Sequence, residues 1–233
     1  MNQDAPTIKV LSTHAVVEVL GELGPAFERA SGYTLSCGYD PASAIRRRID
    51  GNEEFDVAIV TRTVIGDLAR QGKILAETCV DLGRSGLGVS VRKGAPRPAV
   101  SSVEDFKRAL LSAKSIVRSA EGTSGQYFMT LLERLGIAGD MRDKIRLGYS
   151  GRIAERVARG EAELAVQQVS ELLPVAGTDY AGPFPPELQL YTVFSAGVGA
   201  GCKNRAAAKA FIDTLAAPAA AALFKSKGLE PAR

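Results

Sequence analysis

The feature that most constrains the fold is a unit of β-strand, polar turn and amphipathic helix that occurs three times in the first 72 residues. Strands that alternate with helices in this way indicate an α/β fold with a largely parallel sheet. The expected strands are Ile8–Leu11, Tyr33–Tyr39 and Phe55–Val60, and the expected helices are Ala15–Ser31, Ala44–Ile49 and Val64–Gln71. Ligands of open α/β sheets bind beyond the carboxyl ends of the strands, so these three turns are expected to face one site.

The first turn contains Ser12, Thr13 and His14, the only histidine of the chain. The first N–H groups of a helix have no partner within it, and the helix dipole is positive at that end, so such a turn favours a bound anion. His14 has two interpretations. It is either a donor within the turn, or a donor to a bound carboxylate that also carries a proton, because the ordinary pKa of histidine lies near neutrality.

A second series of strands and helices follows the glycine-punctuated segment 82–91. The expected strands are Ser115–Val117, Lys144–Leu147 and Glu163–Gln168, with helices starting near Ser101–Glu104, Gly122–Gly125 and Tyr149–Arg152. Segment 188–198 is expected to be extended, and Asn204–Ser226 is expected to be one alanine-rich helix. We therefore expect two lobes, residues 1–82 with 199–233 and residues 83–198. Two extended segments, near residues 83–91 and 190–198, would cross between the lobes and form a hinge.

Composition argues against several classes of protein. The net charge is +3, aromatic residues are 6% of the chain and only Arg46–Arg48 forms a basic run, so nucleic-acid binding is not expected. No apolar run approaches the roughly 20 residues of a membrane helix. Cys37, Cys79 and Cys202 lack the spacing of a metal or redox site and are expected to be buried thiols, with one disulfide as the alternative. No metal or cofactor is expected. The N-terminal residues show no leader pattern, so the protein is periplasmic if a leader was removed and cytoplasmic if this N-terminus is native.

The order of these segments resembles the molybdate-binding, ModA-like branch of periplasmic solute-binding proteins, which have the type II binding-protein fold, over essentially the whole chain. The stretches that carry the resemblance are Ile8–Ala15 with its helix, Ile49–Gly51 leading to Phe55–Ile59, Gly122–Gly125, Val157–Val166 and Ala207–Gly228. The resemblance implies a monomeric protein whose two lobes close by a hinge over a small anion. It also implies delivery of that anion to the membrane subunit of an ABC transporter.

In that family, hydroxyls and backbone amides at the helix starts hold the anion. The resemblance places them, together with the residue at the family's ligand tyrosine, at Ser12, Thr13, His14, Ser43, Thr123, Ser124, Gly125, Ser150, Gly151, Arg152 and Gln168. Two direct donors of the family differ here. Ala15 stands where a hydroxyl is expected, and Gln168 replaces the tyrosine. Molybdate or tungstate is therefore disfavoured, and an organic carboxylate is expected instead.

Arginines near the strand ends support a carboxylate, because the planar guanidinium group matches a carboxylate and neutral donors suffice for a tetrahedral oxyanion. They are Arg62, Arg84, Arg118 and Arg152. For each of them, an ordinary salt bridge is the alternative interpretation.

Other functions stay open. Aconitate isomerase is similar in fold to these binding proteins and moves a proton along an allylic tricarboxylate. On this chain, His14 would be the catalytic group of such an isomerase, with Arg62, Arg84 and Arg152 holding the carboxylates. Molybdate or another oxyanion is a second alternative, and the ligand-sensing domain of a regulator is a third.

Overall fold

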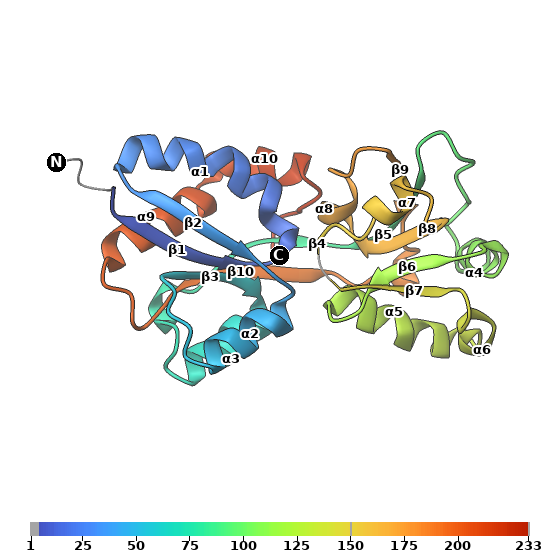
Figure 1. Cartoon of the computed structure of the whole chain (residues 1–233), viewed down its shortest axis with the longest axis horizontal. Coiled ribbons are helices and arrows are strands. Elements are labelled where there is room, and N and C mark those ends of the chain that lie inside the picture. Colours follow the sequence, from blue (N-terminus) through green and yellow to red (C-terminus); the bar gives the residue numbers. More distant parts are fainter. Residues whose placement is uncertain (1–4, 150, 233) are drawn as a thin grey trace. The chain divides into compact units, whose positions relative to one another are not determined.

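The computed structural model describes residues 5–149 and 151–232, and the chain divides into two compact units. Unit 1 comprises Met1–Arg84 and Val193–Arg233, and unit 2 comprises Ser85–Thr192. Each unit, taken by itself, is a five-stranded sheet with helices on both faces (Figure 1). The expected α/β fold with two lobes is therefore confirmed, whereas motion about a hinge stays a prediction.

The unit boundaries differ from those expected at residues 83 and 198. The chain enters unit 2 after Arg84 and leaves it after Thr192. The second difference is larger because β10 (Thr192–Val198) pairs antiparallel with β3 (Val57–Thr61), a strand of unit 1. Backbone pairing, which the hydropathy pattern does not reveal, decides where one unit ends.

The sheet of unit 1 has the strand order β2-β1-β3-β10-β4. β1 (Thr7–Ser12) lies between β2 (Thr34–Tyr39) and β3 and runs parallel to both, and β4 (Val80–Ser85) is the outermost strand next to β10. Ser12, the last residue of β1, pairs with Tyr39 on one side and Ile59 on the other. The carboxyl ends of the three parallel strands therefore meet at one edge of this sheet, as predicted.

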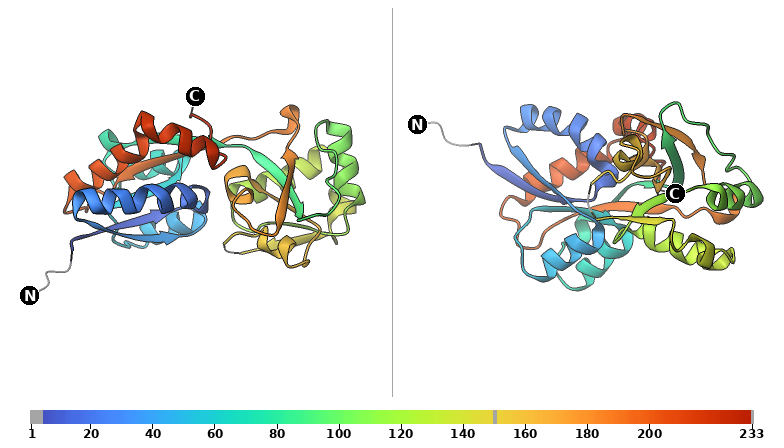
Figure 2. Two further views of the ribbon diagram at one scale, coloured as in Figure 1. Left: turned by 90° about the horizontal axis from the view of Figure 1, so that it is seen from above. Right: turned by 45° about the vertical axis from the view of Figure 1, so that its right-hand side comes forward.

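One face of this sheet is covered by α1 (Val17–Ser31), α9 (Arg205–Ala216) and α10 (Ala221–Ser226). α1 and α9 lie side by side, as both views in Figure 2 show. Their contact includes Phe27 and Phe211, whose ring centroids are 5.1 Å apart. Burial of such aromatic side chains contributes roughly 1.5–3 kcal/mol each, so this layer is a major part of the core.

The other face is covered by α2 (Ala42–Asp50) and α3 (Arg62–Arg70). α2 begins two residues earlier than expected, directly after Pro41, so Ser43 lies inside its first turn. Its N-cap residue is Pro41, and no side chain caps the first N–H groups of this helix. Gly72 follows α3 with φ of 70°, a left-handed conformation that glycine adopts easily, and the helix ends there.

The alanine-rich C-terminal segment is not one continuous helix. Between α9 and α10 lies the 3-10 turn η4 (Pro218–Ala220), because proline cannot continue the hydrogen-bonding pattern of a helix. Among the described residues, no single helix is long and apolar enough to cross a membrane. The segment reaches that length only as a pair of helices bent by 50°, and its apolar side chains lie in the core of unit 1.

The sheet of unit 2 has the order β7-β6-β8-β5-β9. β6 (Ile116–Ser119) lies between β7 (Ile145–Gly148) and β8 (Leu164–Gln168) and is parallel to both. β5 (Leu87–Arg92) pairs antiparallel with β8, and β9 (Thr178–Pro183) pairs antiparallel with β5. A parallel trio followed by an antiparallel strand repeats the arrangement of unit 1.

The helices of unit 2 also form two layers. α4 (Val103–Ser112), α5 (Thr123–Arg134) and α6 (Ala138–Met141) cover one face, and α7 (Glu155–Ala158) and α8 (Val169–Leu172) pack on the other. Sequence patterns did not predict α6, α8 or β9, which are short or contain turn-forming glycine and proline. Two further 3-10 turns are η2 (Ala76–Thr78) and η3 (Pro186–Leu188).

Candidate functional site

Helices that follow the parallel strands begin without a side-chain cap. In the part of the chain that the structure describes, no capping side chain bonds the first N–H groups of η1 (His14–Val16), α2, α3 or α5. α4, which does not follow a parallel strand, differs because Ser102 Oγ accepts a hydrogen bond from the Asp105 N–H. The uncapped N–H groups at the carboxyl edges of both sheets suit a bound anion.

The turn between β1 and η1 contains a buried hydroxyl group that is free to bind a ligand. Thr13 Oγ1 has no hydrogen-bond partner among the described residues, and Thr13 is only 5% exposed. Its neighbour Ser12 donates through Oγ to the Thr13 carbonyl at 3.1 Å, and the Thr13 N–H donates to the Ile59 carbonyl at 2.9 Å. An unpaired buried polar group costs about 1–3 kcal/mol, so a ligand oxygen at Thr13 Oγ1 would be stabilised.

Tyr39, at the end of β2, lies beside His14 and was not predicted as a site residue. The two ring centroids are 6.2 Å apart, with the ring planes inclined by 40°. Burial raises the pKa of Tyr39 above its ordinary range, and the neighbouring Cys37 adds to this effect, so the phenol is a neutral group. The signal in the sequence is its position, because a residue at the end of a strand parallel to β1 must lie near the first turn.

Arg62 and Arg84 are held in ion pairs within unit 1. Arg62 Nε donates to Asp81 Oδ1 at 3.0 Å, and Arg62 Nη2 donates to Oδ2 of the same carboxylate. Burial opposes ionisation of Asp81, but hydrogen bonds from Arg62 and from Ser195 outweigh burial and lower its pKa. Arg84 Nη2 lies 3.1 Å from Glu230 Oε2. These two arginines therefore make the salt bridges that the sequence left as the alternative.

Arg118, on β6, differs from Arg62 and Arg84 in its hydrogen bonds. Its Nη1 donates to the Ser119 carbonyl at 2.8 Å, and its buried Nε has no partner among the described residues. No carboxylate in residues 5–149 and 151–232 forms an ion pair with it. Burial lowers the pKa of Arg118, and the nearby Tyr149 partly offsets this effect. A partly buried charge without a counter-ion is unfavourable, so Arg118 is suited to binding an anion.

The turn from β6 into α5 is closely packed. Thr123, Ser124 and Gly125 form the first turn of α5, and Ser124 is buried whereas Thr123 is exposed. The Gly122 N–H donates to Ser119 Oγ at 2.9 Å. A Cβ atom at Gly125 would lie 1.9 Å from the Ser119 carbonyl oxygen. Only glycine permits this approach, which fixes the start of α5 beside Arg118.

The turn after β7 is described only in part, because the predicted site residue Ser150 lies outside the described residues. Gly151 adopts φ of 69°, and Arg152 lies just before α7 and accepts a hydrogen bond from the Glu155 N–H at 2.9 Å. Tyr149 is 69% exposed. The predicted contacts of Gly151 and Arg152 with a ligand stay predictions.

Gln168, at the end of β8, is buried and its side-chain amide is fully hydrogen-bonded. In the orientation that satisfies both ends of the amide, its oxygen accepts from Thr192 Oγ1 at 2.8 Å. Its nitrogen donates to the carbonyls of Ser85 at 2.9 Å and Gly86 at 3.2 Å. Gln168 therefore fastens the end of β8 to neighbouring segments of unit 2, and its contact with a ligand stays a prediction.

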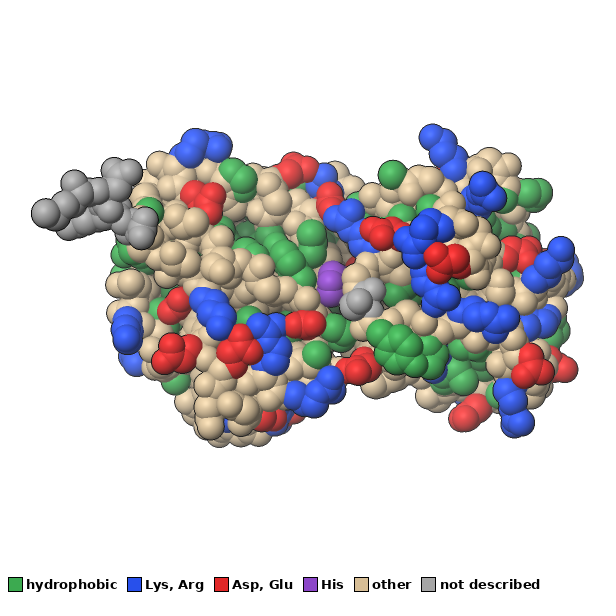
Figure 3. All heavy atoms as spheres, in the orientation of Figure 1, with side chains coloured by type: hydrophobic (Ala, Val, Ile, Leu, Met, Phe, Trp, Pro, Cys, Tyr) green, Lys and Arg blue, Asp and Glu red, His purple; other side chains and the backbone are tan. Residues whose placement is uncertain are grey.

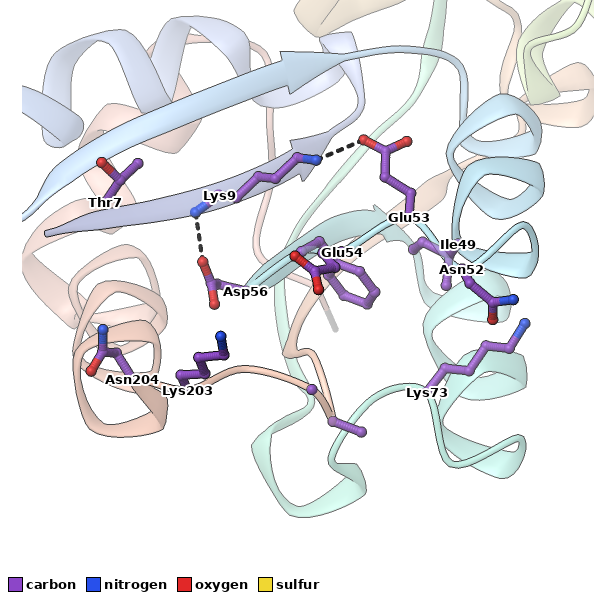
Figure 4. Close-up of a pocket in the computed structure, with 13 residues that line it drawn as sticks. Thr7, Lys9, Ile49, Asn52, Glu53, Glu54, Asp56, Lys73, Lys203 and Asn204 are labelled. Atoms are coloured by element: carbon purple, nitrogen blue, oxygen red, sulfur yellow. Dashed lines mark hydrogen bonds and ion pairs between the residues drawn. The ribbon is translucent and has the colours of Figure 1, made fainter.

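A pocket of about 460 Å³ lies at the opposite edge of the sheet of unit 1, near the starts of β1 and β3 (Figure 4). Lys9 Nζ binds Glu53 Oε1 at 2.9 Å, and the Lys9 N–H donates to Asp56 Oδ2 at 2.8 Å. Lys73 Nζ binds Asp50. These charged groups are paired with one another, and none of the predicted site residues lines this pocket.

Basic and acidic side chains are interspersed over the face in Figure 3. Many of them are ion pairs, such as Arg156 Nε with Glu161 Oε2 at 2.8 Å. Among the described residues, no group of three His, Cys, Asp or Glu side chains could hold a metal ion. Cys37, Cys79 and Cys202 are free thiols.

Comparison with known proteins agrees with this architecture. The chain is 33% identical over 235 residues to aconitate isomerase from Pseudomonas sp., a match that covers 98% of this chain and 89% of that protein. It is 24% identical over 230 residues to the molybdate-binding protein ModA of Escherichia coli strain K12, covering 97% and 89%. The periplasmic molybdate-binding protein of Azotobacter vinelandii has the same fold, with a TM-score of 0.81 and 19% identity over 97% of this chain and 100% of that one.

These matches confirm the resemblance to the ModA-like branch. The family described as bacterial extracellular solute-binding proteins matches residues 8–230, which include all strands of both sheets except the first residue of β1. By its sequence and its fold, the chain belongs to the family of bacterial extracellular solute-binding proteins.

Proposed function

We propose that this protein binds a small organic carboxylate in the periplasm and delivers it to the membrane subunit of an ABC transporter. The observation that carries the proposal is Arg118. Its partly buried guanidinium lies at the start of α5 and has no carboxylate partner among the described residues. A planar guanidinium binds a carboxylate with two parallel hydrogen bonds and supplies the charge that neutral donors lack.

The remaining groups favour a carboxylate over molybdate. Ala15 is apolar and buried, and the Gln168 amide makes its hydrogen bonds within unit 2. Two donors that would hold a tetrahedral oxyanion in the family are therefore lacking or engaged. In contrast, Thr13 Oγ1 and Arg118 Nε each lack a hydrogen-bond partner among the described residues, and a carboxylate oxygen can accept from either group.

Calorimetric titration tests this proposal. We expect citrate, tricarballylate or an aconitate to bind more tightly than molybdate and sulfate. Loss of a charge-assisted hydrogen bond costs about 1.5–3 kcal/mol, so Arg118→Ala should weaken carboxylate binding by roughly tenfold to 150-fold. Arg118→Lys should restore part of the affinity, since it keeps the charge but not the planar fork.

Arg134→Ala is the matched control, because Arg134 is an exposed arginine at the far end of α5. It should bind the carboxylate as the unmodified protein does. Tight binding of molybdate alone, or full carboxylate affinity in Arg118→Ala, would overturn the proposal.

A second candidate function is isomerisation of an unsaturated tricarboxylate. It is supported by the 33% identity to aconitate isomerase and by the position of His14 beside Tyr39 at the carboxyl edge of unit 1. In this reaction a base removes a proton from a methylene carbon, the double bond moves by one position, and a proton is returned to the other end of the allyl system. His14 would carry the proton, since imidazole exchanges protons near neutral pH.

Proton NMR shows whether the protein only binds trans-aconitate or also isomerises it. We expect the isomerase to convert trans-aconitate into the cis isomer and, in D₂O, to introduce deuterium at the reacting carbons. His14→Gln should lose this turnover while keeping binding. If trans-aconitate binds tightly and stays unchanged over hours, the protein is a binder and not an isomerase.

A further inference from the structure

Tyr149 is a large aromatic side chain with little structural role of its own. It is 69% exposed, the largest exposed fraction among the described large hydrophobic side chains that are exposed, which also include Leu147, Leu173 and Tyr191. A ring left mostly in water contributes little to a core. Its position therefore calls for an explanation other than packing.

The topology of unit 2 puts Tyr149 next to the turn that contains Arg118. Tyr149 directly follows β7, which lies beside β6 in the sheet (Figure 1). Ser119 pairs with Gly148, and the Ala120 N–H donates to the Gly148 carbonyl at 2.8 Å. The two chain segments thus leave the sheet together, and Tyr149 is close enough to Arg118 to influence its ionisation.

We propose that Tyr149 contacts the ligand together with Arg118 and makes the site selective for a planar, unsaturated carboxylate. This inference rests on the proposed carboxylate-binding function. Arg118 binds a carboxylate group, and the exposed ring of Tyr149 covers the carbon skeleton attached to it. A conjugated carbon chain is flat and stacks on an aromatic face, whereas the tetrahedral carbons of a saturated chain hold the ring at a greater distance.

The matched ligands for the test are trans-aconitate and tricarballylate, which have the same three carboxylates and differ only in the carbon–carbon double bond. Stacking on an aromatic ring is worth a factor of roughly three to ten in affinity. We therefore expect the unmodified protein to bind trans-aconitate about threefold to tenfold more tightly than tricarballylate, measured by calorimetric titration.

Three variants assign this preference to the ring. Tyr149→Ala should bring the two affinities to within about twofold of each other, because the stacking surface is lost. Tyr149→Phe keeps the ring and should keep the preference. Leu173→Ala, which removes another exposed apolar side chain of unit 2, should change neither affinity. The melting temperature of Tyr149→Ala without ligand should match that of the unmodified protein, because the ring of Tyr149 is largely in water.

The results separate this inference from the proposed function. If neither tricarboxylate binds, the proposed function itself fails. If both bind and Arg118→Ala weakens both, but the preference is absent or survives in Tyr149→Ala, the proposed function stands and the role of Tyr149 is refuted.

Discussion

Glu171 offers a quantitative test of how burial controls the stability of unit 2. It lies in α8, and burial raises its pKa to about 7, although a hydrogen bond from Gln167 opposes the shift. The other end of this amide, Gln167 Oε1, is buried and has no partner among the described residues. A protonated Glu171 can accept from the amide nitrogen and donate to the amide oxygen, so its neutral form suits this environment better.

The sign of the pH dependence follows from the raised pKa. Glu171 imposes no cost below its ordinary pKa of 4.5, and its ionisation lowers the free energy of unfolding progressively between pH 4.5 and about 7. Above about pH 7, the loss in free energy of unfolding that ionised Glu171 causes is constant. A rise in pKa from 4.5 to about 7 corresponds to ~3.4 kcal/mol, at ~1.36 kcal/mol for each tenfold change in proton affinity. Because the side chain is partly exposed, solvent screening reduces the expected cost to ~1–2 kcal/mol.

The perturbation is Glu171→Gln, which replaces the carboxyl group by a neutral amide of the same shape. Urea denaturation should show the variant and the unmodified protein equally stable at pH 4.5, and the variant more stable by ~1–2 kcal/mol at pH 8. Glu133→Gln, an exposed carboxyl group on α5, is the control and should give no such divergence. An identical stability difference for Glu171→Gln at both pH values would show that ionisation of Glu171 does not destabilise the protein.

Three further predictions concern other parts of the molecule. Arg62→Ala removes an exposed ion pair, so it should lower the midpoint of urea denaturation only slightly and change carboxylate affinity by no more than about threefold. A much larger loss of affinity in calorimetric titration would put Arg62 in contact with the ligand. Gly125→Ala forces a Cβ against the Ser119 carbonyl and should destabilise the protein by about 1–3 kcal/mol. Gly21→Ala, in open space on α1, should instead stabilise the protein by about 0.5–1 kcal/mol. Equal melting temperatures for the two variants would contradict the packing at Gly125. Burial raises the pKa of Cys202 to about 11, so this thiol should react with a disulfide reagent at pH 8 far more slowly in the native protein than in urea.

Local sequence patterns predicted most of the regular structure, because alternating and helical hydropathy depend on residues close together in the chain. They failed where a segment owes its conformation to a distant partner. β9 ends in Gly182 and Pro183, which suggest a turn, yet it pairs with β5 about 90 residues earlier in the chain. The break at Pro218 was visible in the sequence, but the flanking alanines favoured one continuous helix.

The candidate site also combines features that follow from local sequence with features that depend on distant contacts. Local sequence patterns were enough to predict that polar turns and helix starts follow the parallel strands, since a strand-to-helix transition is a local pattern that leaves backbone N–H groups unpaired. Which charged groups are available to a ligand depends instead on contacts between distant parts of the chain. Arg62 pairs with Asp81, 19 residues away, and Arg84 pairs with Glu230, 146 residues away, whereas Arg118 finds no such partner among the described residues. Ion pairs form between groups that folding brings together, so the chain order alone could not distinguish these three arginines.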